Sequence, residues 1–324
     1  MAKARAIVKR RKAVRNIKKI TKTMQMIATA KFQKSLKRAV GTKPYTMKVR
    51  ELVRELAASV GNVEHPLLRK VTDENRTNKI ALIVLTSNRG LAGAYNGSVL
   101  RAATVFLKQQ DAAGKTVELH VAGKKGIAYF NFQKRPITQK LDAQDTPRFD
   151  DVEKVTEHFM KEFIAGKIDS LHVAYMNFVS AGVQKPDITT ILPLAGVEEV
   201  STHLAQQHHE TDTQTKAGAM DTSHRPGTAA APGKLVAETT YDFSPEPKAL
   251  LDELLPLTVK SAMFQAYLDA TTSEHVSRMV AMKSATDNAD KMQKALTMQY
   301  NRARQSQITT ELSEIMGGVE AMKK

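Results

Sequence analysis

Residues 273–318 read SEHVSRMVAMKSATDNADKMQKALTMQYNRARQSQITTELSEIMGG, and this stretch decides the fold. It contains no proline, and its only glycines are its last two residues, so the backbone can form one nearly unbroken helix. Apolar residues recur at the 4-3-4 spacing of a coiled-coil seam, at Ala285, Ala289, Met292 and Leu296. The spacing returns in a shifted frame at Ile308, Leu312, Ile315 and Val319. We therefore expect a long helix that packs one face against a partner helix.

The partner helix is expected at the other end of the chain. Residues 17–32 read IKKITKTMQMIATAKF and carry a 3-4-3 seam at Ile17, Ile20, Met24 and Ile27. We predict helix from residue 2 to about residue 59, bent or loosened at Gly41 and Pro44, because proline lacks a backbone donor and clashes with the preceding turn. A helix of about 60 residues extends roughly 90 Å and must protrude from a domain of this size.

Two such helices bury their seams most economically against each other, which predicts an antiparallel coiled coil. A compact helical bundle is the alternative, but bundle helices are usually broken by loops well before this length.

Between the terminal helices the apolar period changes to that of strands and short helices. Strands are predicted at 79–86, 116–122, 171–179 and 187–194, the last two as antiparallel neighbours. Helices are predicted at 96–110, 124–132 and 151–163. The fold class is therefore α+β or α/β, a long antiparallel two-helix coiled coil from both termini plus a small central α/β domain.

The chain divides into four predicted parts. They are an N-terminal coiled-coil helix (1–60), a central α/β domain (75–196), a flexible polar insertion (197–240) and a C-terminal coiled-coil helix (245–324). Within the insertion, residues 201–234 contain no aromatic, Ile or Val residue, so this segment cannot bury enough apolar area to offset its ordering entropy.

The positive charge of the chain is concentrated in its first fifty residues. The net charge is +16, and residues 1–50 hold 17 Lys and Arg with no Asp or Glu, so the remainder is nearly neutral. Such a segment fits an organellar transit peptide, a nucleic-acid-binding arm, or a helix that lies against an acidic protein surface. The ordered apolar spacing within it argues against a disordered tail.

Composition and motifs give little support to catalysis. The chain has no cysteine, which excludes disulfides, thiolate metal sites and cysteine nucleophiles, and it has no apolar run long enough to span a bilayer. The GKT of residues 114–116 lacks the first glycine of a phosphate-binding loop, and the glycines of SNRGLAGAYNG are spaced wrongly for a dinucleotide loop. We predict no catalytic residue, no metal site and no cofactor, hence a mechanical or binding protein rather than an enzyme.

Three segments resemble the gamma subunit family of F-type ATP synthases: residues 17–32, residues 273–318, and SNRGLAGAYN at residues 87–96. The similarity runs from residue 1 to about 195 and from about 240 to 320. It implies the central rotor shaft of a proton-translocating ATP synthase, which couples rotation of the membrane c-ring to conformational cycling of catalytic beta subunits. The implied partners are the alpha and beta subunits of the alpha3beta3 ring, the epsilon subunit and the c-subunit ring, with no nucleic acid.

The resemblance also implies a place in the cell and a set of contact residues. The implied location is peripheral, on the cytoplasmic face of the bacterial plasma membrane, with no active site in this chain. Met24 matches the axle surface that faces the beta subunits, and Arg278 matches the partner side of that region. The polar contacts with the alpha-beta ring match Arg304, Gln305, Thr309 and Glu311.

Two other functions stay open on the residues alone. A nucleic-acid-binding protein with a basic helical arm predicts retention on DNA that weakens steeply with salt. A nucleotide-binding enzyme predicts that the isolated chain binds ATP or a dinucleotide.

Overall fold

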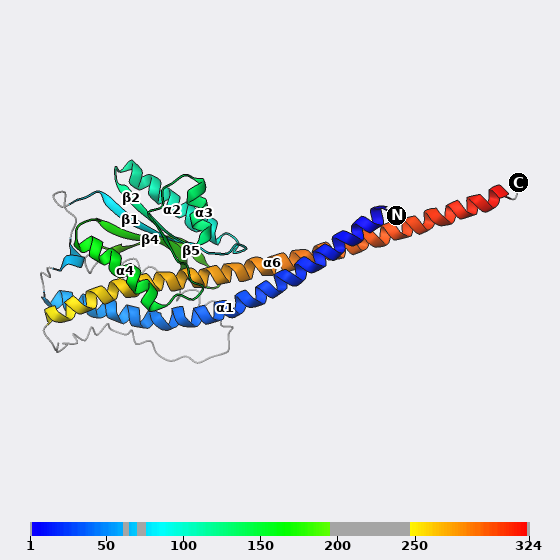
Figure 1. Ribbon diagram of the computed structural model, residues 1–324. Coiled ribbons are helices and arrows are strands. Elements are labelled where there is room, and N and C mark those ends of the chain that lie inside the picture. The colour runs from blue at the N-terminus through cyan, green and yellow to red at the C-terminus, as the bar shows by residue number, and fades with distance from the viewer. Residues whose placement is uncertain (1, 61–64, 70–75, 195–246, 323–324) are drawn as a thin grey trace, which may run out of the picture.

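The computed structural model describes residues 2–60, 65–69, 76–194 and 247–322, and it is a long two-helix rod with a domain at one end (Figure 1). Helix α1 (Ala2–Val60) and helix α6 (Pro247–Met322) run antiparallel along each other. Both helices are continuous, α1 through Pro44 and α6 through Pro256. The predicted fold class is confirmed, whereas the predicted insertion at 197–240 lies outside the described residues.

Two buried hydroxyl pairs fix the register of the coiled coil. Thr21 Oγ1 and Thr286 Oγ1 lie 2.9 Å apart, and Ser35 Oγ and Thr272 Oγ1 lie 2.8 Å apart. The fourteen residues between the two pairs on α1 match fourteen residues in the opposite direction on α6. This match is what two antiparallel helices with the same rise per residue require.

The α1 seam lies on a different side of the helix from the one predicted. Among its buried residues is a heptad repeat of mostly small and hydroxyl side chains, at Val14, Thr21, Ala28 and Ser35. The predicted seam residues Ile17, Ile20 and Ile27 are 52%, 59% and 53% exposed, so that prediction was wrong. An apolar count overlooks threonine and serine, which enter a seam when their hydroxyls pair across it.

The predicted seam of α6 is confirmed at two of its residues and wrong at a third. Ala289 and Leu296 are buried beside Val14, as the spacing predicted. Met292, from the same predicted set, is 55% exposed, because the helix turns it away from α1.

The domain is a five-stranded sheet in the order β3-β2-β1-β4-β5. Strands β1 (Lys79–Leu85), β2 (Thr116–Ala122), β3 (Gln139–Leu141) and β4 (Ser170–Phe178) are parallel, and β5 (Gln184–Leu192) is antiparallel to β4 as predicted. The three-residue β3 was not predicted, because it is too short to show a period. The remaining elements are α2 (Tyr95–Ala112), α3 (Lys124–Phe132), α4 (Phe149–Ile164) and a 3-10 turn, η1 (Pro66–Leu68).

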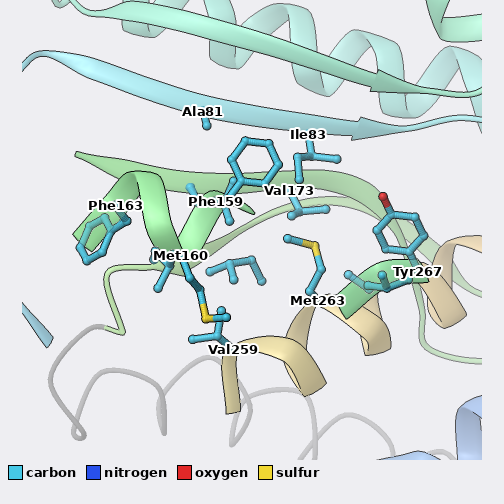
Figure 2. Close-up of a cluster of buried hydrophobic side chains, with 14 of the residues drawn as sticks. Ala81, Ile83, Phe159, Met160, Phe163, Val173, Val259, Met263 and Tyr267 are labelled. Atoms are coloured by element: carbon cyan, nitrogen blue, oxygen red, sulfur yellow. The ribbon is translucent and has the colours of Figure 1, made fainter. Parts of the chain in front are cut away.

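Alternate residues of the buried strands supply two separate cores. Leu82 and Val84 of β1 pack with α2 and α3 on one face of the sheet. Ala81 and Ile83 face the other way, toward α4 and α6 (Figure 2). The core on this second face includes Phe159, Met160 and Phe163 of α4 and Val259, Met263 and Tyr267 of α6. The first part of α6 is therefore a core helix of the domain, and its continuation is half of the rod.

Candidate subunit-contact surface

The predicted seam residues of α1 form an exposed stripe instead. We call the set Ile17, Ile20, Met24 and Ile27 the α1 stripe; its isoleucines are mostly exposed and Met24 is half-buried. The 3-4-3 spacing keeps them on one side of the helix. Exposed basic side chains such as Lys19 and Lys22 lie within the same turns. An apolar stripe on a solvent-facing helix indicates a surface that another protein covers.

The far end of α6 stands free of α1. The register of the hydroxyl pairs places Ala2 level with about residue 305, and α6 continues alone beyond it (Figure 1). We call residues 304–322 the tip. Its large apolar side chains are exposed at Ile308, Leu312, Ile315, Met316, Val319 and Met322.

Four of the predicted contact residues lie on the tip, and all four are exposed: Arg304, Gln305, Thr309 and Glu311. Thr309 donates a hydrogen bond to the carbonyl of Gln305 (3.0 Å), and Gln307 donates to Glu311 Oε1 (2.8 Å). Each bond joins residues four apart on one helix, so it leaves the rest of both side chains accessible to a partner.

Arg278 has a different environment from the other five predicted residues, because it is only 9% exposed. Its guanidinium pairs with Glu274 Oε1 at 2.7 Å and donates to the carbonyls of Arg89 (3.2 Å) and Gly90 (3.3 Å). Burial raises the pKa of Glu274, and the charge and hydrogen bond of Arg278 oppose that rise. Arg278 thus fastens the loop between β1 and α2 to helix α6.

The fastened loop presents side chains outward. Gly93 lies beside Ala281 of α6, and its φ of +56 favours a residue without a side chain. Arg89 and Leu91 point outward and are exposed, Leu91 at φ +63. Arg89 Nη1 lies 3.7 Å from Asp145 Oδ2, but its side chain remains 73% exposed, so both side chains are accessible beside the rod.

A second loop joins the domain to α1. Asp145 Oδ2 accepts a hydrogen bond from Lys31 Nζ of α1 at 2.5 Å, and this bond lowers the pKa of Asp145. His275 of α6 lines the same small pocket as Asp145, and Asn88 of the first loop donates to the carbonyl of Ala143 (2.5 Å). We call the two loops, residues 87–94 and 142–148, the collar. The sequence indicated the first loop but not the second. The second loop contacts α1 through the single side chain of Asp145, and one acidic residue in a loop is not a recognisable motif.

The described residues include no group of three or more His, Asp or Glu side chains placed to hold a metal ion. Within the same ranges, no helix has the length and apolarity needed to cross a bilayer.

Comparison with known proteins gives consistent matches over the whole chain. A family model described as ATP synthase matches residues 3–322. The ATP synthase gamma chain of Rhodopirellula baltica is 40% identical over 324 residues, covering 100% of both chains. That of Leptospira biflexa is 36% identical over 323 residues, covering 99% of this chain and 100% of the relative. The comparisons lend no support to a nucleic-acid-binding protein.

Solved structures share the fold. A chain of the Euglena gracilis mitochondrial ATP synthase, in an assembly of OSCP, F1 and c-ring, matches with a TM-score of 0.61 at 17% identity, covering 99% of this chain and 95% of that one. A chain of the Tetrahymena thermophila central stalk and c-ring matches with a TM-score of 0.53 at 18% identity, covering 82% and 99%. With the rod, the tip and the collar in place, and with full-length relatives that are 40% and 36% identical, the chain belongs to the ATP synthase gamma chain family.

Proposed function

We propose that this chain is the central rotor shaft of an F-type, proton-translocating ATP synthase. The observation that carries the proposal is the shape of the rod: a member of the gamma chain family has a two-helix axle whose longer helix ends in a free apolar tip. The tip enters a ring of three alpha and three beta subunits, and the domain stays outside at the foot.

The axle acts through its asymmetry. One side carries the α1 stripe, the other sides do not, and the axle thins from two helices to one at the tip. Each beta subunit therefore meets different side chains at each angle of the axle. A difference in contact free energy between two conformations shifts their equilibrium, so turning the axle drives each beta subunit through its cycle.

The contact residues follow from this geometry. Met24, within the α1 stripe, contacts the beta subunits, and Arg304, Gln305, Thr309 and Glu311 contact the alpha-beta ring around the tip. These five side chains are exposed or half-buried, which supports the assignment. Arg278 acts indirectly, since its guanidinium holds the collar loop that presents Arg89 and Leu91.

Torque passes from the α/β domain to the two-helix axle because helix α6 belongs to both. Val259 and Met263 of α6 lie fully buried in the domain core, and Lys260 pairs with Glu153 and Glu157 of α4, each at 2.7 Å. Close-packed cores transmit strain, so the domain and α6 turn together. The Lys31–Asp145 contact ties α1 to the same body.

The chain itself performs no chemistry in this scheme. Catalysis belongs to the beta subunits, and the gamma chain needs no cofactor for its part. The c-ring turns the foot, and the epsilon subunit binds the gamma chain outside the ring. Through these partners the chain is peripheral to the membrane, on the cytoplasmic face in a bacterium.

The experiment is a pull-down of the tagged full-length chain from native membranes in low salt. The proposal expects the alpha, beta, epsilon and c subunits in the bound fraction, with ATPase activity. Retention of nucleic acid without these subunits would instead favour the DNA-binding alternative. A variant with Ile17→Ser and Ile20→Ser is the comparison: it should retain less alpha and beta while its thermal unfolding is unchanged, because both side chains are exposed.

A further inference from the structure

A carboxyl group lies buried in the seam between α1 and α6. Asp269 of α6 is 4% exposed and lies one helical turn from Thr272, which pairs with Ser35 of α1. One turn in the other direction, Gln265 Nε2 donates to Asp269 Oδ1 at 3.0 Å. The Oε1 atom of Gln265 is buried and has no hydrogen-bond partner among the described residues.

This arrangement suits a protonated carboxyl better than an ionised one. A buried acceptor without a donor costs free energy, and so does a buried charge that is not closely paired. When Asp269 carries a proton, its O–H can donate to Gln265 Oε1 while Gln265 Nε2 donates back. The acid and amide then form a neutral pair in which both groups are satisfied.

The charged group that faces Asp269 across the seam is Lys43 of α1. Its charge acts on the carboxyl, yet no ion pair between Lys43 and Asp269 is formed within 4.0 Å in the described chain. Lys43 directly precedes Pro44, where α1 lacks one backbone donor. Gly41, two residues earlier, has no neighbour within 4 Å of its Cβ direction. Ala39 and Thr46 hold the buried side of this part of α1, so the weak point is the backbone at Pro44 on its exposed side.

We propose that Asp269 and Gln265 form a proton-binding site inside the coiled coil, and that release of the proton to solvent loosens α1 around Lys43. The ionised carboxylate is not satisfied by Gln265 alone and takes water as a further partner, and water enters the seam only when α1 moves away from its closed position. The site is independent of the rotor assignment and goes beyond it, because it concerns the stiffness of this segment alone.

The direction of the titration agrees with the geometry. Burial raises the pKa of Asp269 to about 6, against the opposing effects of Lys43 and the Gln265 hydrogen bond. No charged side chain of the described α/β domain contributes to this shift. Because the folded pKa lies above the unfolded one, the group stabilises the fold most at acid pH and loses this contribution as pH rises through about 6.

The test uses the full chain or the assembled complex with carbon-13-labelled aspartate. Infrared spectroscopy should show the carbonyl band of a protonated aspartic acid at pH 5, and the band should titrate away near pH 6 and be absent in Asp269→Asn. Hydrogen exchange of a peptide covering residues 38–48, corrected for intrinsic rates, should be about tenfold or more faster at pH 7.5 than at pH 5. In Asp269→Asn this pH dependence should vanish, since an amide can donate to Gln265 at every pH.

The matched control is Asp290→Asn. Asp290 pairs with Lys18 across the same coiled coil, but its side chain is 44% exposed, so this variant should keep the wild-type pH response. A labelled band that is absent at every pH, or that persists in Asp269→Asn, overturns the proposal. Exchange over residues 38–48 that is equal at both pH values overturns it as well. If Asp269→Asn does not fold, Asp269→Glu supplies the assignment, because the aspartate-labelled band must then disappear.

Discussion

Arg278 shows how one side chain joins parts of the chain that are far apart in sequence. It sits on the long helix, pairs with Glu274 and holds the carbonyls of residues 89 and 90. Nothing in the sequence indicates this role, because an arginine on a long helix is most often solvated. Two of its three contacts are with a loop that lies almost two hundred residues earlier.

Replacing Arg278 with Ala should destabilise the chain by about 3–5 kcal/mol, because it leaves the Glu274 carboxylate buried without its partner. It should also speed tryptic cleavage after Arg89 as the collar loop comes free. Urea unfolding and timed proteolysis measure the two effects. Arg148→Ala is the control: its pair with Asp150 is largely exposed, so the change should stay within about 0.5 kcal/mol. Equal behaviour of the two variants would contradict the fastening role.

Gly123 is the residue at which the backbone most requires glycine. It has φ +95, and an added Cβ would overlap the carbonyl of Thr86. We expect Gly123→Ala to lower the free energy of unfolding by about 3 kcal/mol. Gly97→Ala, inside α2 with nothing within 4 Å, should instead raise it by up to about 1 kcal/mol. Denaturant titration of both variants measures the two free energies of unfolding. A Gly123→Ala variant as stable as the wild type would contradict the prediction.

At the scale of elements, the sequence predicted most helices and strands within a few residues, because a buried strand and a long helix each have a clear apolar period. Strand β2 and helix α3 were predicted at the residues where they occur. The buried side of α1 was predicted wrongly at Ile17, Ile20 and Ile27. Over residues 17–28 its isoleucines are exposed and its seam uses Thr21 and Ala28, so burial there depends on a partner surface that one sequence does not contain.

The assignment of α6 faces can be tested on two residues of the same predicted seam. Leu296→Ala should cost about 2–3 kcal/mol, since this leucine is buried beside Val14. Met292→Ala, four residues earlier and exposed, should cost under about 0.5 kcal/mol. Thermal unfolding followed by helical circular dichroism gives both values. If Met292→Ala were the more damaging change, the seam would be on the other face.

At the scale of the whole molecule, helix length and the two apolar seams predicted a protruding antiparallel rod. It could not predict that the first part of α6 completes the core of the domain. Val259 and Met263 have the same apolar spacing as residues of a free coiled coil, and only packing against α4 and the sheet distinguishes them. The polar contact residues of the tip were predicted from the resemblance to the gamma subunit family. The contacts that hold the collar loops to α1 and α6 became visible only in the structure.

The charge of α1 predicts how the complex assembles. A basic helix that enters a ring with acidic loops should bind more weakly as salt rises, because exposed charges are screened. Reconstitution of the complex at about 50 mM and about 300 mM salt, a range over which the screening length shortens substantially, measures this. Lys19→Gln with Lys22→Gln, both exposed, should reduce the salt dependence. Assembly that ignores ionic strength would count against an electrostatic fit.

The rotor assignment is tested most directly by watching the domain turn. The chain has no cysteine, so Phe132→Cys, at an 87% exposed position, gives one attachment point for a bead on the domain. With the complex fixed to a surface through its beta subunits, ATP should drive the bead in one direction, in steps of one third of a turn. A bead that stays fixed or only fluctuates, while the same complexes hydrolyse ATP, would contradict the rotor shaft.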